Sequence, residues 1–151
     1  MAWFEGTHTE AVTVGSDLAR VQTHFSDLEA IIRHSSDVAS AQTEGDVVHF
    51  VLEPQDHGIA KFEGRYSCRY QVGEDGAVRW ETLGEGNTDQ SGEALFTTLP
   101  EGGTRIDYRE TVKIDLDVPK MMAPVLKPLI SQVLAHAIKG YLRRMVGDLE
   151  A

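Results

Sequence analysis

The stretch PKMMAPVLKPLISQVLAHAIKGYLRRM, from Pro119 to Met145, is predicted to form the longest helix of the chain. Beyond Pro128, apolar residues recur at helical spacing and make a broad stripe, with polar residues on the opposite side. The ring of Pro128 would meet the carbonyl group of Pro124, which predicts an irregular or bent start of the helix. One amphipathic helix of this length is expected to cover the apolar side of a sheet.

Strand patterns fill most of the chain before this helix. Residues 60–72 and 104–116 alternate apolar and polar side chains, as strands with one solvent-facing side do, and this alternation indicates antiparallel pairing. The turn signals TEGD, PQDHG, GEDG and PEGG separate further strands. Near the N-terminus, Ser16 can cap the helical segment DLARVQTHF, and Ser26 with Glu29 can form a capping box for DLEAIIRH.

These elements predict an α+β fold in one domain, residues 1–151. The expected order is one strand, two short helices, about six further strands and the long C-terminal helix. The strands would form a curved antiparallel sheet of about seven strands, and the long helix would pack across its concave face.

This order, the segment AVTVGSDLARVQTHFSD and the ending GGTRIDYRETVKIDLDVPKMMAPVLKPLISQVL resemble the START/Bet v 1-like helix-grip superfamily (SRPBCC). The resemblance covers essentially the full chain and is greatest to the bacterial polyketide cyclase/dehydrase and lipid-transport branch. Members of that kind include carriers of hydrophobic ligands, aromatic polyketide cyclases, quinone-binding proteins and accessory proteins. The resemblance implies a cavity between the sheet and the long helix but does not name its occupant.

Composition narrows the classes of partner. The chain has 24 acidic and 14 basic residues, a formal net charge of −10, which repels nucleic acid phosphates and anionic lipid head groups. The lone Cys68 cannot form an intrachain disulfide, and no apolar run approaches the length that spans a membrane. The start MAWFEGTHTE lacks a basic region followed by an apolar stretch. We therefore expect a soluble cytoplasmic protein that is not integral to a membrane and does not bind nucleic acid.

Glu110 is the exception in its strand, because alternation places it on the same face as Tyr108, Val112 and Ile114. A desolvated, unpaired carboxylate there would have a raised pKa, as expected of an acid, a base or an anchor for a ligand hydroxyl or ammonium group. The alternative is a β-bulge, or a salt bridge at the end of the sheet. Glu110 is therefore the leading candidate for a catalytic residue.

The candidate ligand-binding residues share the inward face of the strands or the region of the long helix. They are Phe62, Tyr66, Cys68, Tyr70, Trp80, Phe96, Thr98, Tyr108, Glu110, Met122, Leu126, Leu129, Ile130, Val133 and Ala137. Aromatic rings with a few hydrogen-bond donors are typical of a small-molecule pocket, although the same set could make an ordinary core. The six histidines show no metal-ligand spacing, so no metal and no cofactor is expected.

The sequence thus predicts that the protein binds or transports a hydrophobic small molecule, of lipid-, quinone- or polyketide-like kind, in an internal cavity. A second hypothesis is an enzyme of the polyketide cyclase or dehydratase type, in which Glu110, a cavity tyrosine or His136 moves protons on a bound polyketone. A third is an accessory protein that acts through its surface while side chains fill the cavity.

Overall fold

A computed structural model describes residues 2–56 and 61–150 of the chain. In order along the chain, the elements are β1 (Ala2–Val14), α1 (Leu18–Ser26), α2 (Leu28–His34), β2 (Val38–Glu44), β3 (Val47–Leu52), β4 (Gln55–Asp56), β5 (Lys61–Phe62), β6 (Arg65–Val72), β7 (Val78–Leu83), β8 (Thr88–Thr98), β9 (Thr104–Leu116) and α3 (Ala123–Glu150). Seven strands form one antiparallel sheet in the order β1-β9-β8-β7-β6-β3-β2. The predicted α+β fold is confirmed.

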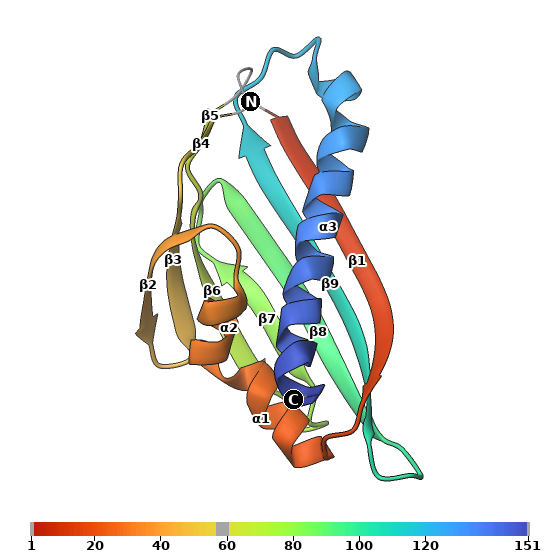
Figure 1. Ribbon diagram of the computed structural model, residues 1–151. Helices are drawn as coiled ribbons and strands as arrows, with labels where there is room; N and C mark the ends of the chain where they lie inside the picture. Colours follow the sequence, from red (N-terminus) through yellow and green to blue (C-terminus); the bar gives the residue numbers. More distant parts are fainter. Residues whose placement is uncertain (1, 57–60, 151) are drawn as a thin grey trace.

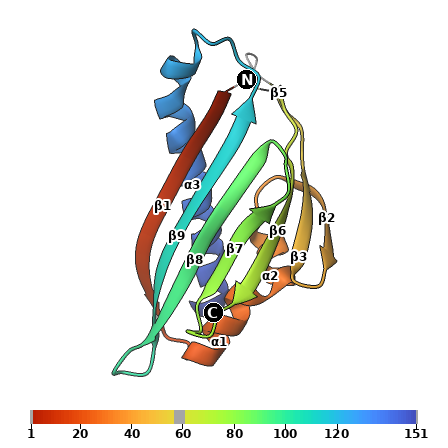
Figure 2. The same cartoon turned by 180° about the vertical axis from the view of Figure 1, so that it is seen from behind.

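Helix α3 runs across one face of the sheet, and α1 and α2 lie on that same side near its C-terminal end (Figure 1). The opposite face of the sheet is seen in Figure 2, and none of the three described helices covers it. This one-sided covering explains the alternation in the sequence, because only one side of each strand is removed from water.

The predicted strand at residues 60–72 is divided in two. Its first part is β5, which pairs with β4 in a separate two-stranded sheet, and its second part is β6. The break falls at Gly64, where an added Cβ would lie 2.6 Å from the side chain of Leu52. The amide of Leu52 also donates to the carbonyl oxygen of Gly64 at 2.8 Å. Ala60, which the prediction placed in this strand, lies outside the described residues.

The short helices are capped by aspartates rather than by the predicted serines. Asp17 caps α1 and Asp27 caps α2, each accepting a hydrogen bond from a backbone amide in the first turn. The hydroxyl of Ser16 instead donates to the carbonyl oxygen of Leu149 at 2.7 Å, and that of Ser26 donates within α1. The bond from Ser16 ties the end of β1 to the last turn of α3.

Helix α3 begins at Ala123 and continues through Pro128, so the two prolines do not delay its start. It lies close to β1 because Gly6 has no side chain there. A Cβ on Gly6 would be 2.6 Å from Cβ of Leu134 and 2.7 Å from the carbonyl oxygen of Ser131. The near approach of helix and strand positions the apolar side of α3 over the sheet.

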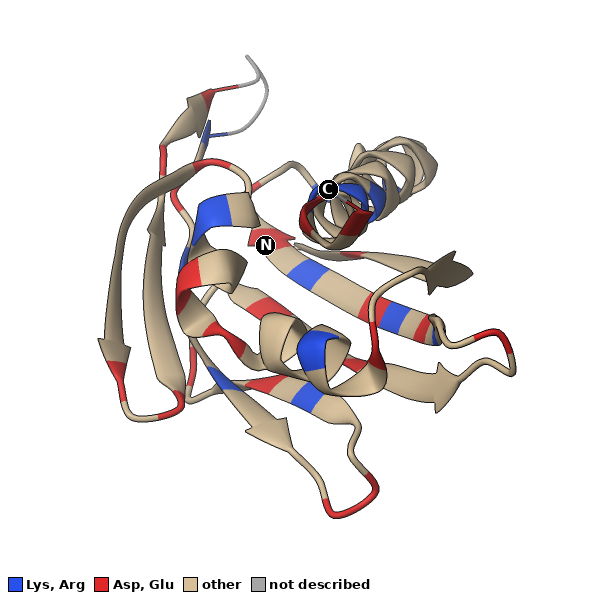
Figure 3. Cartoon of the chain, turned by 60° about the horizontal axis from the view of Figure 1, so that its bottom comes forward, with Lys and Arg blue, Asp and Glu red and all other residues tan. Residues whose placement is uncertain are grey.

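Two apolar clusters fill the space between the helices and the sheet. The larger cluster lies under α1, α2 and the C-terminal half of α3 and includes Phe25, Tyr108 and Leu142. The smaller one lies near the start of α3 and includes Phe4 and Phe62. Acidic residues lie at several turns and along the strands (Figure 3). No described helix is both long enough and apolar enough to cross a bilayer.

Candidate functional site

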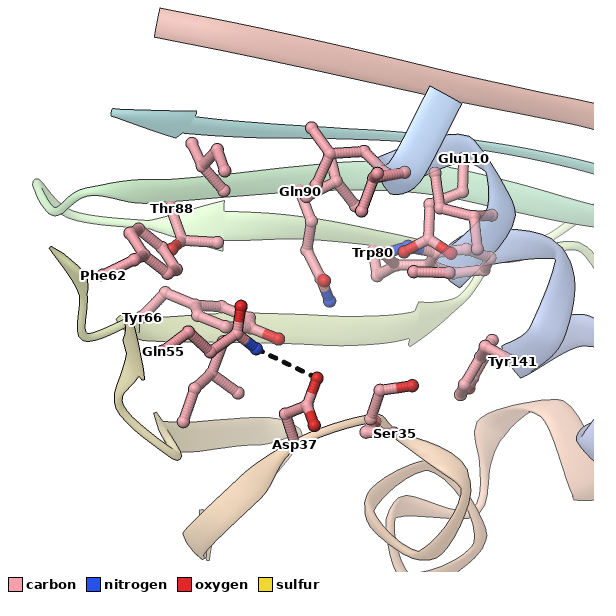
Figure 4. Close-up of a pocket in the computed structure, with 18 of the residues that line it drawn as sticks. Ser35, Asp37, Gln55, Phe62, Tyr66, Trp80, Thr88, Gln90, Glu110 and Tyr141 are labelled. Atoms are coloured by element: carbon pink, nitrogen blue, oxygen red, sulfur yellow. Dashed lines mark hydrogen bonds between the residues drawn. The ribbon is translucent and has the colours of Figure 1, made fainter. Parts of the chain in front are cut away.

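A cavity of about 210 Å³ lies between α3 and the sheet, where the two apolar clusters meet (Figure 4). Its walls come from β5 to β9, from α3, from the segment between α2 and β2, and from β3 and β4. The lining residues are Ser35, Ser36, Asp37, Leu52, Gln55, Phe62, Tyr66, Tyr70, Trp80, Thr88, Gln90, Glu110, Val112, Ile114, Val133, Leu134, Ala137, Ile138 and Tyr141. Twelve of the nineteen are apolar or aromatic, and seven are polar.

Part of the predicted residue set lines this cavity. These residues come from β5, β6, β7, β9 and α3, and they are Phe62, Tyr66, Tyr70, Trp80, Glu110, Val133 and Ala137. The strand residues among them share the inward face that alternation predicts. Val133 is 60% exposed, so it lies at the rim of the cavity rather than within it.

Cys68 and Tyr108 face inward but lie behind the cavity wall. The side-chain amide of Gln90, which lines the cavity, donates to Sγ of Cys68 at 3.6 Å. Burial also raises the pKa of Cys68 to about 12, so the thiol holds its proton. Tyr108 packs against Trp80, with ring centroids 5.5 Å apart, and only its hydroxyl reaches toward the site. Neither residue lines the cavity.

Phe96 and Thr98 are also absent from the lining, because the helices fill the other end of the sheet. The ring of Phe96 packs on Phe25 of α1, with centroids 5.6 Å apart. Thr98 ends β8 and is exposed. Alternation correctly assigns the face of β8 that these residues share with Gln90, but it does not show that α1 covers the far end of that face.

On the long helix and directly before it, four predicted residues do not line the cavity. Leu126 and Ile130 are partly buried and pack against the smaller apolar cluster. Met122 precedes the helix and is half-buried, and Leu129 is 59% exposed. The apolar stripe of α3 is wider than the part of the helix that packs on the sheet, so one edge of the stripe faces solvent. His136, a candidate proton carrier, is exposed and does not line the cavity.

Glu110 lies at the inner wall in regular strand pairing, opposite His8 of β1 and Gly92 of β8, so it is not in a bulge. Its side chain is buried, and none of the described ion pairs includes it. The hydroxyl of Tyr108 donates to Oε1 of Glu110 at 2.6 Å. Burial raises the pKa of Glu110 to about 7, while hydrogen bonds from Tyr108 and Trp80 act in the opposite direction.

Gly92 makes room for the indole ring of Trp80, which lies beside the carboxyl group of Glu110. In the sheet, Gly92 stands between Trp80 on β7 and Glu110 on β9. A Cβ at this position would lie 2.5 Å from the indole ring of Trp80, so only glycine lets the indole lie across β8. A glycine inside a strand pattern is a sequence signal that could have pointed to this close approach, but the sequence analysis did not use it.

Several lining residues were not predicted, and they supply most of the polar groups. Gln90 donates to the hydroxyl of Tyr70 at 3.2 Å. At the rim, Gln55 donates to Asp37 at 3.0 Å, as the dashed line in Figure 4 marks. Asp37 has a positive φ of 58° and belongs to no periodic element, so no sequence pattern pointed to it. Tyr141 belongs to the helix stripe, but a stripe alone does not distinguish lining from core.

The tyrosines of the wall hold their protons at neutral pH. Burial raises the pKa of Tyr66, Tyr70 and Tyr141 well above the ordinary value for tyrosine. Each can therefore donate or accept a hydrogen bond but carries no charge. Within the described residues, no group of three or more His, Cys, Asp or Glu side chains could hold a metal ion.

By sequence, no protein family and no curated protein matches the chain. Solved structures do match over nearly the full length. A Thermus thermophilus protein has a TM-score of 0.67 at 19% identity, covering 95% of this chain and 96% of its own. A START superfamily protein from Mycobacterium smegmatis has a TM-score of 0.66 at 14% identity, covering 95% and 97%. The Zhui aromatase/cyclase from a Streptomyces species has a TM-score of 0.66 at 14% identity, covering 97% and 94%.

The chain has the START/Bet v 1-like helix-grip fold. The resemblance to this superfamily is therefore confirmed at the level of the fold. At these sequence identities the matches establish the fold of the chain and not its ligand or chemistry.

Proposed function

We propose that this START-like protein binds a small hydrophobic molecule in the cavity between α3 and the sheet. The observation that carries the proposal is the cavity itself, about 210 Å³ with a largely aromatic and aliphatic lining. START superfamily and aromatase/cyclase proteins among its structural neighbours support it as an analogy of fold.

The volume limits the size of the ligand. An apolar cavity of about 150 Å³ holds one benzene molecule. A cavity of about 210 Å³ therefore fits one ring with a short chain better than a lipid with two acyl chains. Because Val133 at the rim is largely exposed, a longer ligand could leave a tail outside.

A second candidate function is proton-transfer catalysis of the cyclase or dehydratase type. The observation in its favour is Glu110, whose pKa of about 7 suits a general acid or base at neutral pH. We favour binding because the titratable groups near Glu110 on β6, β9 and α3 are tyrosines and Cys68, whose raised pKa values make them poor partners for a two-group proton transfer.

Trp80 makes a direct test of binding practical. The chain has two tryptophans, Trp3 and Trp80, so a Trp3→Phe background leaves Trp80 in the cavity wall as the sole indole. Titration with toluene or 3-phenylpropan-1-ol should change the emission of Trp80 in a saturable manner. Ala137→Phe in the same background should narrow the cavity and weaken binding by about tenfold, or about 1.4 kcal/mol.

Leu129→Phe is the matched control, because Leu129 is on the same helix but does not line the cavity. This variant should bind both probes like the parent protein. Folded Ala137→Phe protein with unchanged affinity, or absence of any saturable signal with either probe, would count against the proposed function.

A further inference from the structure

The charged groups in the cavity wall all have the same sign. Its lining contains two carboxyl groups, Glu110 on β9 and Asp37 on the segment before β2. Among the described lining residues, none is Lys, Arg or His. In a wall of low polarity, carboxylates without a basic partner create a negative potential that attracts cations and repels anions. The formal net charge of −10 acts in the same direction at longer range.

The nearby basic residues have other partners. His8 stands across from Glu110 in the sheet, but its Nε2 is 2.8 Å from Oε1 of Glu10. Arg143 also binds Glu10. Arg144 donates to the backbone oxygen of His34 and to Oγ of Ser36, both at 2.9 Å. These contacts leave Glu110 without a positive counterpart in the described part of the chain.

Six groups near Glu110 are uncharged at neutral pH. They come from β6, β7, β9 and α3, and they are Tyr66, Cys68, Tyr70, Trp80, Tyr108 and Tyr141. On the rim, Asp37 is exposed and accepts its hydrogen bond from Gln55. No described ion pair includes Glu110, so a positively charged ligand group could pair with its carboxyl group.

Aromatic rings complete the setting for a cation. Tyr66, Tyr70, Trp80 and Tyr141 all line the cavity, and the rings of Tyr70 and Trp80 are stacked with centroids 6.0 Å apart. The faces of such rings attract ammonium groups, and desolvation strengthens the attraction. Figure 4 shows Trp80 directly beside Glu110, so one ligand group could contact both the indole and the carboxylate.

We propose that the cavity selects ligands that carry a positively charged amine on a small aromatic or aliphatic body. This inference rests on the proposed binding function and names the class of its ligand. A carboxylate ligand would be repelled by both acidic groups. An alcohol could accept or donate one hydrogen bond but would leave the charge of Glu110 unbalanced.

Three probes of similar shape separate these classes: 3-phenylpropylamine, 3-phenylpropan-1-ol and 4-phenylbutanoate. At about pH 8 the amine is a cation, the alcohol is neutral and the acid is an anion. In the Trp3→Phe background, the amine should bind at least about tenfold more tightly than the alcohol, and the anion should bind weakest.

Two further comparisons assign the preference to Glu110. Glu110→Gln keeps the shape of the side chain and should reduce the advantage of the amine over the alcohol to about twofold or less. Asp89→Asn removes an exposed carboxylate of β8 that points away from the lining residues Thr88 and Gln90, and it should leave the advantage intact. Lowering the pH from about 8 to about 6 should weaken binding of the amine about tenfold. Glu110 takes up its proton as the pH falls through about 7, and only its ionised form attracts the cation.

The possible failures can be told apart. Equal or tighter binding of the alcohol or the anion would overturn the amine preference while leaving the proposed binding function in place. Loss of the amine preference in Asp89→Asn as large as in Glu110→Gln would overturn the assignment to the cavity. If neither toluene nor any of the three probes alters the emission of Trp80, the proposed binding function itself fails.

Discussion

Glu110 is held in an apolar wall by regular strand pairing, and its nearest polar partner is Tyr108 at 2.6 Å. Because the Tyr108 hydroxyl donates to the carboxyl group, it stabilises the ionised form and lowers the pKa of Glu110 against the effect of burial. Tyr108→Phe removes this donor and should raise the pKa of Glu110 above about 7. Titration of the carboxyl carbon by NMR measures this pKa directly.

Tyr66→Phe is the matched control for that measurement. Tyr66 lines the same cavity, and among the described hydrogen bonds none joins its hydroxyl to Glu110. Its removal should leave the pKa of Glu110 close to that of the parent protein. A lowered or unchanged pKa in folded Tyr108→Phe protein would mean that the hydrogen bond does not stabilise the carboxylate.

At the scale of elements, the contact of α3 with β1 depends on Gly6. An alanine Cβ there would lie within 2.7 Å of Leu134 and Ser131 and would push the helix from the strand. Gly6→Ala should therefore lower the free energy of unfolding by about 1–3 kcal/mol, as overpacking does. Urea denaturation measures the change.

Gly15→Ala, directly after the same strand, is the control. The added Cβ meets no atom within 4 Å, so this substitution should change stability by less than about 0.5 kcal/mol. Equal effects of both substitutions would show that the close approach is not what matters.

The helices and strands could be predicted because the spacing of their apolar residues matches the face that packs against the rest of the protein. Alternation in residues 104–116 assigned the inward face of β9, including Glu110, and helical spacing identified α3. A period shows which face is apolar but not what covers each part of it. For that reason Phe96 and Leu129 were assigned to the site, although α1 covers the first and solvent meets the second. Asp37 was missed because it lies in no periodic element, and Gln90 was missed because it is a polar side chain on the inward face of β8.

At the scale of the whole molecule, two carboxyl groups contribute to stability with opposite signs. Glu110 has a pKa raised from 4.5 to about 7, so its buried charge costs about 3 kcal/mol at high pH. Asp148, near the C-terminal end of α3, binds His34 at 2.6 Å and Arg33 at 2.8 Å. These partners lower its pKa from 3.8 to about 2 and connect α3 to α2. Glu110 therefore makes the fold less stable at high pH than at acidic pH, whereas Asp148 loses its stabilising effect under strongly acidic conditions.

These signs predict a stability maximum on the acid side of neutrality. The cost of Glu110 is absent below pH 4.5, grows as the pH rises to about 7, and is constant above that, because the folded state holds the proton more tightly than the unfolded chain. The contribution of Asp148 is complete above pH 3.8 and is lost as the pH falls to about 2. The free energy of unfolding should therefore be greatest near pH 5.

Urea denaturation from about pH 2 to about pH 8 at constant ionic strength measures the free energy of unfolding. Glu110→Gln should remove most of the decline between pH 5 and 8, and Asp148→Asn should reduce the decline below pH 4. A maximum above pH 7, or parallel curves for Glu110→Gln and the parent protein, would show that Glu110 is not a desolvated carboxyl group.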